Sequence, residues 1–154
     1  MLPVRSDGAK HRPVMVHRSI IGSVERAVAQ LFEEHGGAFP VWLAPVQLVV
    51  LPVAEEQRPR AEELVRQAER EGVRVELGGP EHGTLGARGR AARLVPYQAV
   101  IGEREAAGPA GLDGLVALRL RDGRRPGPLT GAQLLHRILT CRAARGPVLW
   151  ETSR

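Results

Sequence analysis

A strand, a helix and a second strand follow one another between Gln47 and Leu77, and this order limits the fold more than any other part of the 154-residue sequence. The apolar run from Gln47 to Val53 is typical of a buried strand. Pro59 stands where the first turn of a helix tolerates proline, and Gly72 can close that helix. The helix has an apolar stripe formed by Ala61, Leu64, Val65 and Ala68. With a strand at Val73 to Leu77, the pattern predicts parallel neighbouring strands joined by a right-handed crossover.

Three further elements are predicted beyond this unit. A glycine-rich loop, Gly78 to Gly86, leads into a short helix at Ala87 to Leu94. A third strand is predicted at Tyr97 to Ile101. Leu115 to Arg121 alternates apolar with polar or small residues, which predicts a strand with one buried face and one wet, basic face.

The last helix has the strongest local signals. Thr130 and Gln133 form a capping box at its start, and Leu134 continues an apolar face on which the only cysteine, Cys141, also lies. We therefore expect Cys141 to be a buried structural thiol. Residues 46–145 together predict an α/β domain with a mixed β-sheet flanked by helices, followed by a tail at 146–154.

The N-terminal part predicts a β-hairpin and a helix. Two extended stretches, Leu2 to Arg5 and Arg12 to His17, flank a turn, and Ser23 can cap an amphipathic helix that ends at Gly36. Two strands and one helix cannot bury a core by themselves, so residues 1–39 are expected to pack on something else. A proline-punctuated linker is predicted at 40–45.

The charge of the chain favours a polyanionic partner such as RNA. Lysine and arginine total 22 against 17 acidic residues, which gives a net charge of +5. Lys10 is the only lysine, so nearly all of the positive charge comes from arginine. This preference for arginine suits bidentate phosphate contacts but is equally explained by genomic codon usage. Because aromatic residues make up only 3%, an RNA surface here would depend on arginine rather than on stacked rings.

The sequence also predicts where the protein is found. No apolar run approaches the roughly 20 residues needed to cross a bilayer. The first residues lack the apolar core of a secretory signal, and a single cysteine forms no disulfide within the chain. We therefore expect a cytoplasmic protein without a membrane span.

Several motifs resemble one enzyme family. They are VMVHR, which ends at Arg18, GSVER, which ends at Arg26, FPVWLAPVQ, which ends at Gln47, and VPYQAVIGERE, Val95 to Glu105. The run from Arg12 to Val53 resembles the junction between the catalytic and anticodon-binding domains of bacterial threonyl-tRNA synthetases, which are class II enzymes. The resemblance implies a remnant of the catalytic domain followed by an anticodon-binding domain, in a truncated paralogue.

The resemblance assigns roles to four residues of the N-terminal part. It implies that His17 matches a zinc ligand, and that Arg26 matches the motif 3 arginine that contacts the ATP phosphates, with Gly22 and Ser23 at the helix start. One imidazole cannot hold zinc, and the chain lacks motifs 1 and 2. We therefore expect no aminoacylation by this chain alone, and zinc or ATP only if a partner completes the site. If no partner completes the site, we expect His17 to be a packed or vestigial histidine and Arg26 to be a solvated surface residue.

The anticodon-binding part departs from its family. The family pattern DxRxExxGxKxR is replaced by LGGPEHGTLGARGR, Leu77 to Arg90, in which Glu81, Gly86, Arg88 and Arg90 can be matched. Recognition of base edges needs polar groups at fixed positions, whereas affinity for the RNA backbone depends on positive charge. We therefore expect this part to retain affinity for RNA although it loses specificity for the anticodon. The RNA-binding candidates are Glu81, Arg88, Arg90, Arg93, Arg119 and Arg121. The alternative for these arginines is an ordinary charged surface.

Four functions remain open from the sequence. The first is a synthetase-like protein that binds tRNA or another RNA. The second is an interaction or regulatory subunit, as a homodimer or with a synthetase-like partner, because the N-terminal apolar face needs burial. The third is one half of a split synthetase, and the fourth is an excised fragment of a full synthetase. The remaining histidines are too scattered for a metal cluster, and Glu103 and Glu105 are expected to be solvated.

Overall fold

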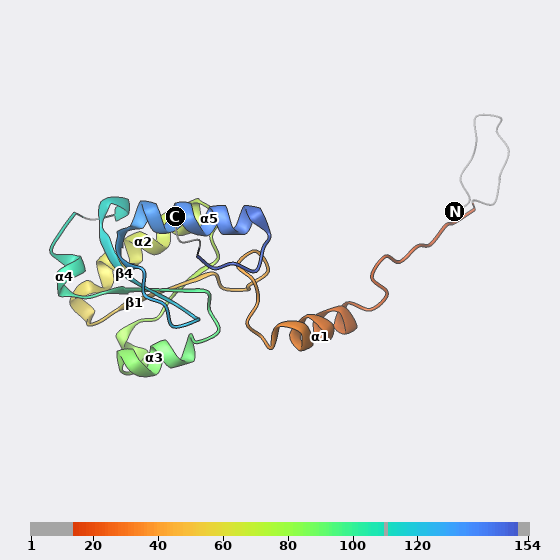
Figure 1. Cartoon of the computed structure of the whole chain (residues 1–154), viewed down its shortest axis with the longest axis horizontal. Coiled ribbons are helices and arrows are strands. Elements are labelled where there is room, and N and C mark those ends of the chain that lie inside the picture. Colours follow the sequence, from red (N-terminus) through yellow and green to blue (C-terminus); the bar gives the residue numbers. More distant parts are fainter. Residues whose placement is uncertain (1–13, 110, 151–154) are drawn as a thin grey trace, which may run out of the picture. The chain divides into compact units, whose positions relative to one another are not determined.

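The computed structural model describes residues 14–109 and 111–150, which fall into two units, Met1–Glu34 and His35–Arg154 (Figure 1). The second unit contains a five-stranded mixed sheet. Its strand order is β2-β1-β3-β4-β5, with β1 parallel to both β2 and β3, and with β4 and β5 antiparallel to their neighbours. The strands are β1 (Leu48–Pro52), β2 (Val75–Leu77), β3 (Tyr97–Ile101), β4 (Leu115–Leu120) and β5 (Gly127–Thr130). The predicted α/β class and mixed sheet are confirmed.

Helices cover the two faces of this sheet unequally (Figure 1). The long helices α2 (Arg58–Arg70) and α5 (Gly131–Ala144) lie on one face, and the short helix α3 (Leu85–Ala91) lies on the other. A single turn, α4 (Glu103–Ala106), follows β3, and 3-10 turns occupy Glu55–Gln57, Pro80–His82 and Gly111–Asp113. Beside α3, part of the sheet therefore has a helix on one face only.

The core lies between the sheet and the two long helices. Buried residues of β1, β3 and β4 contact the apolar stripes of α2 and α5 in one cluster. In β4, Val116 and Leu118 are buried whereas Arg119 is exposed, as the alternation predicts. Cys141 is buried, as expected, with Sγ 3.5 Å from the Leu149 carbonyl oxygen.

Residues of the predicted linker and of the described part of the predicted tail are buried in the second unit. In the linker, Val41 is fully buried, and the side chains of Gln47 and Arg74 donate hydrogen bonds to the carbonyls of Val41, Trp42 and Ala44. At the C-terminal end, Leu149 is 6% exposed and belongs to the core. Val41 and Leu149 thus contribute to the core of the second unit, and the predicted bounds of the linker and the tail stay predictions.

Two elements of the sheet region were not predicted. β5 is a short edge strand with the sequence GPLT, which carries almost no strand signal, and only pairing with β4 makes it extended. The turn α4 begins after Gly102, whose N–H is capped by the Glu105 carboxylate at 3.0 Å. Glu105 is therefore half-buried and bonded rather than simply solvated, as the sequence suggested.

The first unit contains α1 (Val24–His35), which continues one residue into the second unit. Ser23 caps it, as predicted, by accepting a hydrogen bond from Arg26 N at 3.3 Å. The predicted hairpin is not confirmed: Val14 to His17 forms no strand, because no described strand pairs with it, and its first arm lies outside the described residues. None of the helices described is both long and apolar enough to cross a membrane.

Candidate nucleic-acid interface

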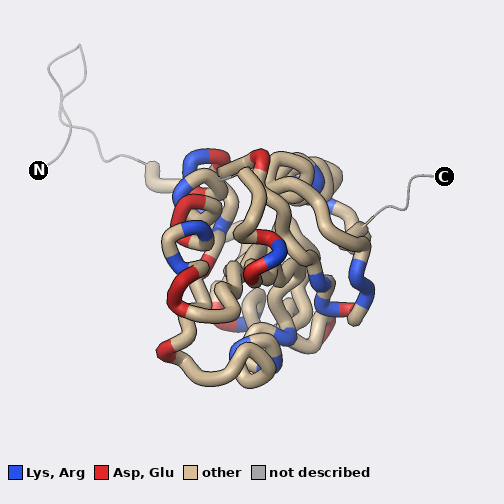
Figure 2. The backbone as a smooth tube through the Cα atoms, turned by 90° about the vertical axis from the view of Figure 1, so that its left-hand side faces the viewer, with Lys and Arg blue, Asp and Glu red and all other residues tan. Residues whose placement is uncertain are grey.

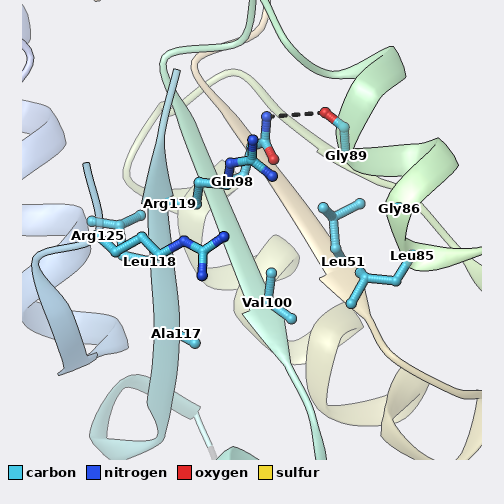
Figure 3. Close-up of a pocket in the computed structure, with 10 residues that line it drawn as sticks. All are labelled: Leu51, Leu85, Gly86, Gly89, Gln98, Val100, Ala117, Leu118, Arg119 and Arg125. Atoms are coloured by element: carbon cyan, nitrogen blue, oxygen red, sulfur yellow. Dashed lines mark hydrogen bonds between the residues drawn. The ribbon is translucent and has the colours of Figure 1, made fainter. Parts of the chain in front are cut away.

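A groove of about 360 Å³ lies between α3 and the part of the sheet that α3 leaves open (Figure 3). β3 and β4 form its floor, and α3 forms its wall. Its lining is mostly apolar, with one amide and two guanidinium groups: Leu51, Leu85, Gly86, Gly89, Gln98, Val100, Ala117, Leu118, Arg119 and Arg125. On the face opposite the core, β3 and β4 contribute two apolar and two polar side chains to this floor: Val100, Ala117, Gln98 and Arg119.

Local interactions fix the wall of the groove. Thr84 caps α3 by accepting a hydrogen bond from Ala87 N at 3.3 Å. Gln98, which is 2% exposed, donates from Nε2 to the carbonyls of Gly89 at 3.3 Å and Ala92 at 3.0 Å. These bonds join the start of β3 to the C-terminal end of α3, so the groove is built into the fold.

The groove is basic as well as apolar. Arg119 lies opposite Gln98 in the β3–β4 register and is exposed, and Arg125 is exposed in the β4–β5 turn. Figure 3 shows both guanidinium groups extending across the sheet face. Arg90 is exposed on α3, a helix that carries arginines and no acidic residue (Figure 2). No carboxylate is among the residues that line the groove, so its charge favours an anion.

Arg88 differs from the other predicted phosphate ligands because it is only 5% exposed. Its Nη1 donates to the carbonyls of Pro52 and Gly78, each at 2.7 Å, and its Nε donates to the Gly83 carbonyl at 2.9 Å. Its Nη2 reaches the Val53 carbonyl at 3.3 Å. The guanidinium therefore connects the carboxyl ends of β1 and β2 to the loop before α3 and is not available to a phosphate. These contacts favour a structural role for Arg88, and RNA binding by this residue stays a prediction.

Two other candidates are also held by neighbours. Glu81 forms an ion pair with Arg58, and its pKa is lowered by its own backbone N–H and then by the Arg58 guanidinium. Arg121 is half-buried and donates a hydrogen bond to the Phe39 carbonyl, and burial lowers its pKa. Neither residue lines the groove. Arg93, which follows α3, is exposed.

A second cleft, of about 540 Å³, lies at the carboxyl ends of β1 and β3. The chain continues from β1 to β2 and from β3 to β4, which lie on opposite sides of the β1–β3 pair in the sheet. Open α/β sheets bind ligands where neighbouring connections diverge in this way. The lining includes Gln57, Arg104 and the carboxylates Glu56, Glu103 and Glu105. The sequence analysis missed this cleft, although its residues directly follow two correctly predicted strands. Its charge is opposite to that of the groove beside α3.

The residues assigned to zinc and ATP do not gather into a site. His17 is exposed, and the described part of the chain contains no group of three potential metal ligands. Gly22 and Arg26 are exposed, and the Ser23 hydroxyl donates to the Glu25 carboxylate at 2.7 Å, which lowers the pKa of Glu25. The Glu25 carboxylate therefore lies at the N-terminal end of α1, where the helix dipole favours a negative charge. The zinc and ATP roles that the resemblance implies for these residues stay predictions.

Comparisons with known proteins place these features in a family. A family model described as "Anticodon binding domain" matches residues 47–140. The chain is 42% identical over 135 residues to a threonine–tRNA ligase from Acetivibrio thermocellus, a match that covers 86% of this chain and 20% of that protein. It is 44% identical over 134 residues to the corresponding ligase from Syntrophomonas wolfei, with coverages of 86% and 20%. The chain thus spans about a fifth of the length of these relatives.

Solved structures agree with this assignment. The RNA binding domain of threonyl-tRNA synthetase from Cryptosporidium parvum superimposes with a TM-score of 0.66 at 34% identity, over 81% of this chain and 30% of that one. A prolyl-tRNA synthetase from the same organism matches with a TM-score of 0.57 at 21% identity, over 69% of this chain and 22% of that one, and shares the fold alone.

Proposed function

The chain belongs to the family of anticodon binding domains, and from this membership we propose that it binds tRNA or a related RNA through the groove between α3 and β4. The observation that carries the proposal is the combination of an apolar floor with exposed arginines and no carboxylate. An unpaired base can lie on the floor formed by Val100 and Ala117, and the guanidinium groups of Arg119 and Arg125 can bind phosphate.

The groove supports backbone affinity more strongly than anticodon discrimination. Arg88 and Glu81, which match the family's anticodon-reading pattern, are occupied by contacts within the chain. The exposed arginines Arg90, Arg119 and Arg125 provide charge without a fixed set of base-edge partners. We propose that the protein binds several tRNAs with similar affinity.

The test measures RNA affinity by filter binding at about 0.1 M salt with a tRNA transcript. Arg119→Ala should weaken binding by roughly tenfold, because a charge-assisted contact to phosphate is lost. Arg70→Ala is the matched control, since Arg70 is exposed on α2, on the other face of the sheet. Equal affinity of the two variants, or no binding by the wild type, would refute the proposal.

We further propose that this polypeptide does not aminoacylate tRNA by itself. His17 is exposed and belongs to no group of three potential metal ligands among the described residues, which supports this view. A threonine-dependent ATP–pyrophosphate exchange assay should give no signal above background, and a signal would overturn the idea. If a second chain completes the enzyme, zinc should bind only to the mixture and should be lost in His17→Ala.

A role in protein interaction is favoured by one specific observation. None of the residues of α1 is buried, and its apolar side includes Val24, 65% exposed, and Val28, 45% exposed. We propose that a second copy of the chain or a synthetase-like partner covers this side. Light scattering should show a mass above that of a monomer, and Val24→Ser with Val28→Ser should reduce it. A monomer at all concentrations that also fails to bind a synthetase would refute this role.

A further inference from the structure

A pocket of about 380 Å³ lies on the outer side of α5, where the C-terminal segment returns toward the helix. Since α5 and α3 cover opposite faces of the sheet, this pocket is separate from the groove beside α3 (Figure 1). Its lining combines one indole ring with several polar side chains: Leu129, Gln133, His136, Arg137, Thr140 and Trp150. The family match ends at residue 140, so Trp150 is a feature outside it.

Trp150 is held in place by several contacts. The Arg137 guanidinium lies over its indole, with Cζ 4.9 Å from the ring centroid. Arg124 Nη1 donates to the Trp150 carbonyl at 3.4 Å. The preceding residue, Leu149, is buried and accepts a hydrogen bond from the Tyr97 hydroxyl at 2.6 Å. A ring fixed in this way can bind a planar ligand without a large ordering cost.

The polar groups of the pocket favour an anion. No carboxylate lines it, and Arg137 forms no hydrogen bond or ion pair with another residue in the described ranges. The Thr140 hydroxyl is occupied by the His136 carbonyl at 2.9 Å, and Gln133 Oε1 accepts from Thr130 N at 3.0 Å. The guanidinium of Arg137, the imidazole of His136 and the amide NH₂ of Gln133 remain as donors for a ligand.

We propose that this pocket binds a nucleoside phosphate, either as a free nucleotide or as an unpaired nucleotide of an RNA strand. The Arg137–Trp150 pair supplies a planar surface on which a base stacks, because bases stack on both aromatic rings and guanidinium planes. The same guanidinium and the donors of His136 and Gln133 bind the phosphate. The volume lies at the lower end of the range for small-ligand pockets, which suits a single nucleotide.

The test uses tryptophan fluorescence, since the chain contains only two tryptophans. In Trp42→Phe, Trp150 is the sole reporter, and in Trp150→Phe the exposed Trp42 is the matched control. With excitation at about 295 nm, where tryptophan alone absorbs, AMP should quench the first variant in a saturable way and leave the second unchanged. Adenosine, which lacks the phosphate, should bind at least about tenfold more weakly.

Further variants test the assignment. Arg137→Gln should abolish saturable quenching by AMP with an unchanged circular dichroism spectrum, whereas Arg119→Ala should leave the quenching intact. The proposal for this pocket and the proposal for the groove beside α3 are therefore tested by different variants. Tighter binding of an adenosine hexanucleotide than of AMP identifies RNA as the source of the ligand. Binding of AMP alone identifies a free nucleotide. Absence of saturable quenching by both ligands, or unchanged quenching in Arg137→Gln, overturns the proposal.

Discussion

Replacing Arg88 by alanine should destabilise the domain, although the sequence suggested an RNA ligand at this position. The side chain is 5% exposed and connects three backbone segments near the carboxyl ends of β1 and β2. Its three shorter bonds, to the carbonyls of Pro52, Gly78 and Gly83, measure 2.7, 2.7 and 2.9 Å. Truncation leaves these carbonyls without their donor and removes the packing of the aliphatic stem.

The magnitude follows from these bonds. Each is worth about 1 kcal/mol net, so Arg88→Ala should lower the free energy of unfolding by about 3 kcal/mol. For a chain of this size, that loss corresponds to a fall in Tm of about 10 °C. Arg88→Lys should recover only part of the loss, because an ammonium cannot reach carbonyls on several sides with a fixed fork.

Urea unfolding followed by circular dichroism measures this change. The midpoint should fall with an unchanged m value, since the surface exposed on unfolding stays similar. Arg90→Ala is the matched control: it lies two residues away on the same helix, is exposed, and should change stability by less than about 0.5 kcal/mol. If both variants were as stable as the wild type and Arg88→Ala lost RNA affinity, Arg88 would be a ligand contact and the structural role would be wrong.

Three other substitutions have defined outcomes. Tyr97→Phe removes the buried hydrogen bond to the Leu149 carbonyl and should cost about 1 kcal/mol in urea unfolding, and an unchanged midpoint would contradict the bond. Thr130→Ala removes the capping box of α5 and should also cost about 1 kcal/mol, with reduced amide protection in the first turn of the helix as its signature. The Arg124 hydrogen bond lowers the pKa of Asp122, so Asp122 stabilises the fold above its unfolded pKa and stops doing so as the pH falls through its lower folded pKa. The stability difference between wild type and Asp122→Asn should therefore be present at neutral pH and disappear in acid, and a difference independent of pH would refute this origin.

The elements predicted from the sequence are those with local signals. The strand–helix–strand unit that became β1, α2 and β2 and the capped helix α5 have periodic apolar residues and recognisable ends, so sequence alone located them. β5 lacks both, because its extended form depends on pairing with β4. The packing of the segment 40–45 likewise depends on donors such as Arg74, which are distant in sequence.

The site was predicted only in part, and the reason is geometric. The alternation of β4 correctly placed Arg119 on the open face of the sheet. The charge pattern predicts the same role for Arg88 and Arg90, although residues two apart on a helix differ by about 200° and so face opposite sides. The buried side of α3 consists of Arg88 and Gly89, whereas Arg90 is exposed. What Arg88 meets there, a set of backbone carbonyls, depends on tertiary structure and has no sequence signal.

The salt dependence of RNA binding distinguishes a defined groove from general attraction to a basic protein. The net charge of +5 is unevenly distributed, because the cleft at the strand ends is acidic whereas the groove beside α3 is not. If the exposed arginines of the groove region, Arg90, Arg93, Arg119 and Arg125, each neutralise one phosphate of a single strand, log Kd should rise with log salt with a slope of about 3. Arg125→Ala should lower this slope by about 0.7, and Arg70→Ala should leave it unchanged. A wild-type slope above about 5 would require phosphate contacts outside the groove, and an equal decrease in both variants would show that net charge rather than the groove attracts the RNA.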